Sequence, residues 1–368
     1  MPQILDSAIK AAAKRIDHYI EIHQAHPEIS FSVHVKAKRK ELASRASAFR
    51  LIYLDTNAWR CLADCLLGRE EKVTPEMKLF AASLEQAANT GKFAFPIGLP
   101  TFFELDSMVD PATRDTVTRL VDELSQGLCI APSPERIGSE LRKLRLTDLQ
   151  TSEGLEDFLC SPVELLGIPA VSLHELLKAK LDEDTFNKAF FDALAELPFS
   201  IQLKVAGSSP HGKWNNSHGI ADLNTGKIEH QEEIANLNTG IFVELKGCIA
   251  AWFAEEGVVT TPQEIALYAL TALYHWHQMP SSRALPTLRV LSSLYGLMRL
   301  DSKRRYQKGD PNDFMVAASA LPVAQALFTA DRKLVYLLSD ARIGFRNFSD
   351  CTVVNGFAEM AKYLDEQR

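Results

Sequence analysis

Short apolar runs that alternate with helical segments constrain the fold of this chain most strongly. Each run has the length of a buried strand, and a segment with helical periodicity follows or precedes it. Strands that alternate with helices form parallel sheets with helices on both faces. We therefore expect an α/β fold whose parallel sheet has about five strands flanked by helices. The expected strands lie at residues 51–54, 94–99, 127–131, 326–329 and 352–354.

The alternation stops in the middle of the chain, where almost every segment has helical periodicity. Thr261 opens one such segment as a capping box with proline at the first helical position. We expect a mostly helical unit inserted into the α/β domain, with a long flexible surface loop at about 206–240, which is rich in Gly, Ser, Asn and His. The expected organisation is an N-terminal helical extension at 1–50, a discontinuous α/β domain at 51–134 and 300–368, and the insertion at 135–299.

Composition excludes several classes of protein. The 40 Lys and Arg residues stand against 47 Asp and Glu residues, so the net charge of -7 excludes a chain that coats nucleic acid through its global charge. No stretch approaches 18 uninterrupted apolar residues, and the first residues lack the features of a signal peptide. The six scattered cysteines lack disulfide or zinc spacing. We expect a cytoplasmic protein with reduced thiols and no membrane association.

Carboxylates recur where the expected strands end. Asp55 follows the first strand, Glu104 lies shortly after the second, and Asp331 follows the fourth. Asp313 opens the helix that leads into that fourth strand. Ligands bind at the carboxyl ends of parallel strands, and four acids gathered there need divalent cations to offset their repulsion. Oxygen ligands favour Mg²⁺ or Mn²⁺.

Each acid also has a purely structural explanation. Asp55 and Asp331 are suited to capping the helices that follow them, and Asp313 suits the first turn of a helix, where the helix dipole favours an acid. Glu104 would then be an ordinary helix-surface residue. Capping does not explain why the acids recur at strand ends, so the combination favours a shared site.

Four segments resemble those of the PIN-domain ribonucleases: LIYLDTN at 51–57, LPTFFEL at 99–105, NDFMVAA at 312–318 and LFTADRKL at 327–334. The resemblance implies a PIN-like fold and a Mg²⁺- or Mn²⁺-dependent endoribonuclease, with a toxin-like or defence role by analogy. It implies that catalytic metal ligands are Asp55, Glu104, Asp313 and Asp331, with Asn57 and Thr329 orienting them or a water. The chain departs from the family because 209 residues separate Glu104 from Asp313.

Two basic runs oppose the overall acidity and predict an RNA-binding surface. Residues 36–50 hold six basic residues and one acid, and residues 299–308 hold five and one. Such runs are often only solvated helix faces, but both end just before a segment that carries a putative metal ligand. Tyr306 is positioned to stack on a base. The candidate phosphate-binding residues are Lys38, Arg39, Lys40, Lys303, Arg304, Arg305 and Lys308.

Two other functions remain open from the sequence. The chain could be a catalytically inactive PIN-like module whose helical insertion binds a protein partner or a second copy of the chain. A phosphatase of the haloacid dehalogenase type also begins with a strand that ends in Asp, but it would need a second acid where Asn57 stands. The ten histidines lack the spacing of a zinc site, so we expect surface or packed residues.

Overall fold

The computed structural model describes residues 2–146, 148–150, 153–167, 181–206 and 219–368. Its centre is a parallel sheet of four strands in the order β2-β1-β5-β6, which confirms the α/β class. The expected count of about five strands is wrong for this sheet. The strands are β1 (Arg50–Leu54), β2 (Phe93–Ala94), β5 (Ala326–Thr329) and β6 (Thr352–Asn355).

The third expected strand does not join the main ladder. β3 (Cys129–Ile130) pairs antiparallel with β4 (Leu159–Cys160), a strand from the expected insertion. An isolated parallel bridge between Ile97 and Cys129 connects β3 to the chain that follows β2. Pro96 lies between β2 and this bridge and has no N–H to donate, so the ladder is interrupted there.

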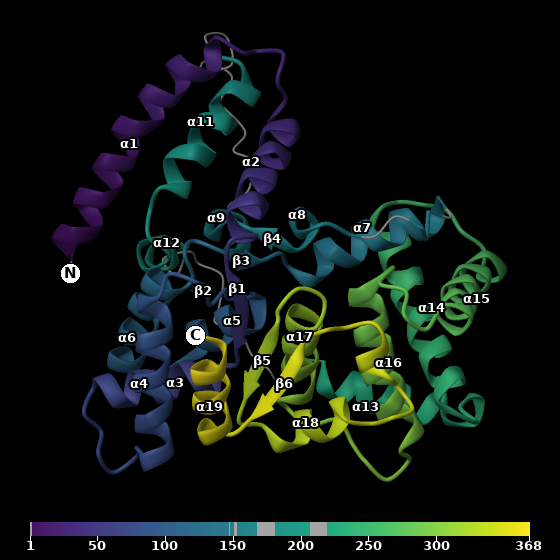
Figure 1. The fold of residues 1–368 in the computed structure, drawn as a ribbon. Helices are drawn as coiled ribbons and strands as arrows, with labels where there is room; N and C mark the ends of the chain where they lie inside the picture. Colours follow the sequence, from purple (N-terminus) through teal and green to yellow (C-terminus); the bar gives the residue numbers. More distant parts are fainter. Residues whose placement is uncertain (1, 147, 151–152, 168–180, 207–218) are drawn as a thin grey trace.

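Both faces of the sheet are covered by helices (Figure 1). Along β1 the side chains alternate, so that Leu51 and Tyr53 enter one core and Ile52 and Leu54 the other. The second core lies under α3 (Thr56–Leu66), α4 (Pro75–Asn89), α6 (Pro111–Leu124) and α19 (Phe357–Gln367). The first lies under α7 (Ser133–Arg145), α14 (Leu237–Glu255), α16 (Pro286–Leu300) and α17 (Asp310–Ala320).

Helices α14 and α16 of the expected insertion pack closely against each other, and both contribute side chains to the core on one face of the sheet. Gly240 of α14 and Gly296 of α16 allow the backbones of the two helices to come into direct contact. A Cβ on Gly240 would lie only 2.7 Å from the Gly296 carbonyl oxygen. The remaining insertion elements are α8 (Leu155–Phe158), α9 (Pro162–Leu165), α11 (Glu183–Ala195), α12 (Phe199–Ala206), α13 (Ile220–Glu229), η1 (Gln231–Glu233) and α15 (Pro262–Gln278).

The prediction of a long loop at 206–240 is wrong where the structure describes that segment. Residues 220–229 form α13, and α14 begins at Leu237. Asn236 caps α14 by accepting a hydrogen bond from the Thr239 backbone amide, so the Leu-Asn-Thr-Gly segment at 237–240 forms the first turn of a helix. Residues 207–218 of the predicted loop lie outside the described residues.

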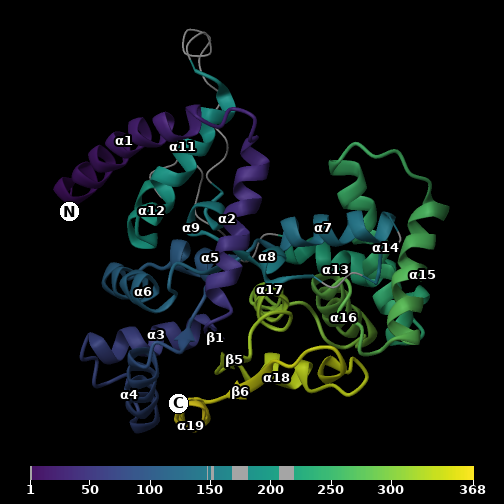
Figure 2. The same ribbon diagram turned by 45° about the horizontal axis from the view of Figure 1, so that its top comes forward.

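The N-terminal extension packs on the insertion. It consists of α1 (Pro2–Gln24) and α2 (Phe31–Ala46), and α1 lies along α11 at the end of the molecule opposite α14 and α15 (Figures 1 and 2). A small core joins Ala12 to Phe191 and Leu194. The last elements are α5 (Leu99–Ser107), α18 (Arg332–Leu338) and η2 (Phe345–Asn347). No helix in the described ranges has the length and apolar character needed to span a membrane.

Candidate metal centre

Asp55 lies at the carboxyl end of the central strand β1 and is 4% exposed. It caps α3, with Oδ1 accepting from the Thr56 amide at 2.7 Å. Its Oδ2 accepts from the Thr329 hydroxyl at 2.8 Å and from the side-chain amide of Asn57 at 3.4 Å. Burial raises the pKa of Asp55 to about 6, against the opposing effect of the Thr329 hydrogen bond.

Asp331 lies at the carboxyl end of the neighbouring strand β5. It caps α18, because Oδ1 accepts from the amides of Lys333 at 2.6 Å and Leu334 at 3.0 Å. The Thr329 hydroxyl that donates to Asp55 also accepts from the Asp331 amide at 3.0 Å. One buried threonine therefore links the two strand-end acids. Both acids act as caps, and their capping does not use Asp331 Oδ2 or Asp55 Oδ2.

Glu104 reaches the same edge of the sheet from α5. Its Oε1 accepts from the side-chain amide of Asn312 at 2.6 Å, which ties α5 to the first turn of α17. Asn312 is 3% exposed, and its Oδ1 is a buried oxygen without a hydrogen-bond partner. Buried polar atoms are rarely left in this state, so this oxygen is a candidate ligand for a cation or its water.

Asp313 is the acid that the charges of the other acids affect most strongly. Its pKa is raised to about 8, first by burial and then by the charges of Asp331, Asp55, Asp310 and Glu104. The structure therefore places the four predicted acids close enough for their charges to raise the pKa values of Asp313 and Asp55. At neutral pH and without a cation, Asp313 is largely protonated.

Asp310 is a fifth acid at this edge, in addition to the four acids predicted from the sequence. It is 4% exposed, accepts from the Gln307 amide at 2.8 Å, and pairs with Arg304 at 3.3 Å. Its ion pair is with Arg304, six residues earlier in the chain, and this pairing could not be inferred from the sequence. Its charge acts on Asp313 through the first turn of α17.

The donor chemistry fits a hard divalent cation. The acids supply only oxygens, and Asn312 adds an unpaired one. Among the described residues, the one group of three possible ligands with atoms within 4.8 Å of one another contains none of the four acids. No three of the four acids therefore have ligand atoms this close together, although the charges of the other three act on Asp313. This arrangement suits Mg²⁺, which binds through one or two carboxylates and retains several waters.

The two basic runs lie in different places. Lys38, Arg39 and Lys40 belong to α2, which precedes β1 and so approaches the sheet from its amino edge. Arg39 pairs with Glu135 at 2.5 Å and Glu164 at 2.6 Å, which raises its pKa despite burial. Lys38 lies 3.6 Å from Glu41, and Lys40 is exposed.

The second run leads directly into α17 and the acidic edge, which is the carboxyl edge of the sheet that carries Asp55, Glu104, Asp313 and Asp331. Lys303, Arg305 and Lys308 are exposed, whereas Arg304 is engaged by Asp310. Tyr306 is 3% exposed and donates to the Tyr295 carbonyl at 3.3 Å, so the expectation that it stacks on a base is wrong.

Comparison of the chain with protein-family models, with curated proteins and with solved structures finds no match.

Proposed function

We propose that this chain is a divalent-metal-dependent endoribonuclease with a PIN-like α/β domain, which hydrolyses RNA phosphodiester bonds at the carboxyl edge of its sheet. The observation that carries the proposal is the convergence on Asp313 of three other acids from separate elements, with a pKa of about 8. Such a strongly perturbed acid group indicates a functional site.

Asp55 and Asp313 would hold Mg²⁺ or Mn²⁺, and Glu104 and Asp331 would complete the centre directly or through water. The bound ion would offset charge at the scissile phosphate and lower the pKa of a water to give the attacking hydroxide. The protein's own contribution is orientation. Thr329 fixes Asp55 Oδ2, and the Asn312 amide fixes Glu104 Oε1, which leaves Asn312 Oδ1 facing its surroundings without a partner.

Exposed basic residues beside the acids would bind the RNA backbone. Lys303, Arg305 and Lys308 precede α17, and the contact of Lys333 Nζ with Gln307 Oε1 at 2.7 Å joins this segment to α18. A cation-rich rim around an acidic centre allows a polyanion to approach it.

Replacing Lys303, Arg305 and Lys308 together by alanine should weaken binding of single-stranded RNA and reduce its salt dependence. Loss of three phosphate contacts should lower the slope of log affinity against log salt by about 2. Fluorescence anisotropy over a range of KCl concentrations measures this slope. The matched control replaces the exposed Lys10, Lys14 and Lys72. Equal slopes in the two triple variants would contradict this RNA path.

Thr329→Val should raise the lower of the two pKa values in the acid limb of the pH–rate profile, which belongs to Asp55, by about one unit. The Thr329 hydroxyl stabilises ionised Asp55, and losing a hydrogen bond to a charged group is worth about 1.5 kcal/mol, or about one pKa unit. Thr329→Ser retains the hydroxyl and should keep the wild-type profile. A valine profile that superimposes on the serine profile would show that this contact does not tune Asp55.

The function itself is tested by incubating the purified full chain with labelled single-stranded RNA, structured RNA and single-stranded DNA in Mn²⁺, in Mg²⁺ and in EDTA. We expect internal cleavage of RNA that EDTA stops. A folded protein that cleaves none of the substrates in either metal would contradict the proposal.

A further inference from the structure

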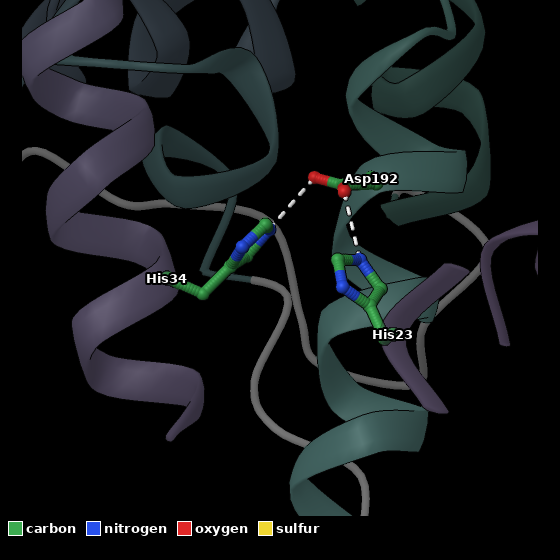
Figure 3. Close-up of side chains that lie close together, drawn as sticks. All are labelled: His23, His34 and Asp192. Carbon is green, nitrogen blue, oxygen red and sulfur yellow. Dashed lines mark hydrogen bonds and ion pairs between the residues drawn. The ribbon is translucent and has the colours of Figure 1, made fainter. Parts of the chain in front are cut away.

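A second cluster of possible metal ligands lies far from the acidic edge, between the N-terminal extension and the insertion. His23 comes from the end of α1, His34 from the first turns of α2, and Asp192 from α11. Figure 3 shows both imidazole rings directed at the one carboxylate. The Nε2 of His23 lies 3.0 Å from Oδ2, and the Nε2 of His34 lies 2.9 Å from Oδ1.

The cluster is withdrawn from solvent. The side chains of His23, His34 and Asp192 are 10%, 11% and 7% exposed. Burial lowers the pKa of His23, which favours the neutral ring that a metal requires. Burial disfavours the ionised form of Asp192, but the hydrogen bond and charge of His34 hold its pKa below the usual value. The cluster thus combines one carboxylate with two imidazole rings in a site that is largely withdrawn from solvent.

The structure assigns His23, His34 and Asp192 as the ligands of a site for a divalent transition-metal ion, of which Zn²⁺ suits the donors best. Two imidazole nitrogens and one carboxylate oxygen form a known type of three-ligand zinc set with a fourth position for water. The acidic edge, in contrast, offers only oxygens. The two centres therefore differ in the metals that they favour.

The spacing of the three ligand atoms is compatible with such an ion. Zn–N and Zn–O bonds of about 2.0–2.2 Å in a tetrahedron separate neighbouring ligand atoms by about 3.3 Å. The two His–Asp contacts are 3.0 and 2.9 Å, and all three atoms lie within 4.8 Å of one another. Binding therefore needs a small outward movement of each ring and loss of the Nε2 protons.

The surroundings hold the cluster in place and leave access to it. Lys188 Nζ donates to the carbonyls of His26 at 2.9 Å and Ile29 at 2.6 Å, which fixes the connection between α1 and α2. A cavity of about 650 Å³, lined in part by Tyr19, Lys38 and Asp192, reaches the carboxylate residue of the cluster.

Lys38 is a cationic neighbour that the ion would displace. Its Nζ lies 3.9 Å from Asp192 Oδ1 and 3.6 Å from Glu41. Its side chain is 40% exposed, so it can remain with Glu41 while leaving Asp192. A bound ion would then tie three helices from two parts of the chain.

The test is equilibrium dialysis of the full chain against Zn²⁺, with bound metal counted by atomic emission. We expect one Zn²⁺ per chain to remain bound when the acidic edge is disabled by Asp55→Asn/Asp313→Asn. In that background, His23→Gln and His34→Gln should each weaken Zn²⁺ binding by about 100-fold. Altering a residue that only supports a metal ligand already costs up to about 100-fold in affinity, and these variants remove a ligand itself. His18→Gln on the exposed side of α1 is the matched control and should bind as before.

Co²⁺ provides a readout that does not depend on the folding of a histidine variant. In the Asp55→Asn/Asp313→Asn protein, it should give the visible absorption of a four-coordinate nitrogen and oxygen site, and added Zn²⁺ should remove that absorption. Absence of both bound Zn²⁺ and the Co²⁺ spectrum would overturn the assignment, as would unchanged Zn²⁺ affinity in folded His23→Gln and His34→Gln. The cluster would then be a hydrogen-bonded clamp only.

Discussion

Asp313→Asn should lower the rate of metal-dependent RNA cleavage by roughly 10²- to 10³-fold, the scale of losing one electrostatic contact at a reacting centre. The amide keeps the size of the side chain but cannot supply a negative ligand oxygen, and Asp313 is the acid on which the others converge. Single-turnover cleavage of labelled RNA in saturating Mn²⁺ measures the effect.

The matched control for this substitution is Asp350→Asn, which alters an exposed acid paired with Arg283 away from the acidic edge. It should cleave RNA at the wild-type rate. Cleavage by Asp313→Asn within a few-fold of wild type would place the chemistry elsewhere.

The second large effect concerns the stability of the metal-free chain. The pKa of Asp313 rises from 3.8 to about 8 on folding, so the folded state binds more protons than the unfolded state between these values. Its contribution to the free energy of unfolding therefore falls as pH rises from about 4 to about 8, and is fully lost above pH 8. Because the neighbouring acids share the repulsion, we expect Asp313 to change the free energy of unfolding by about 2–4 kcal/mol. This is less than the full pKa shift would give for an isolated group.

Urea unfolding in EDTA at pH 5.5 and pH 8 measures this contribution as the difference between wild type and Asp313→Asn. The variant should gain clearly more stability relative to wild type at pH 8 than at pH 5.5, because only part of the loss has occurred by pH 5.5. Using the difference removes the contributions of other acids with raised pKa values, such as Glu140. An equal difference at both pH values would contradict the raised pKa of Asp313.

The acidic edge was predictable because its signal is local. Asp55 directly follows one buried strand, Asp331 lies two residues after the end of another, and adjacent parallel strands end at one edge of the sheet. Their capping role was also visible, since an acid before a helix is a common cap. The structure shows that capping and convergence are compatible, because the Asp331 cap uses one oxygen only.

The contacts that complete this edge were not predictable, because they join residues distant in sequence. Asn312 meets Glu104 across 208 residues, and His23 meets Asp192 across 169. Periodicity also shows that a segment suits a strand without showing its partner, which is why β3 was placed in the wrong sheet. Sequence patterns report local preference, whereas these contacts depend on how α5, α17 and the N-terminal helices pack.

Equilibrium binding of Mn²⁺ to the full chain, followed by the electron paramagnetic resonance signal of free Mn²⁺, tests the proposed metal centre most directly. We expect binding that strengthens as pH rises toward 8, because Asp313 must lose its proton, and that is lost in Asp55→Asn/Asp313→Asn but kept in Asp350→Asn. Mn²⁺ binding that is absent from wild type, or unchanged in the double variant, would contradict a metal centre at this edge of the sheet.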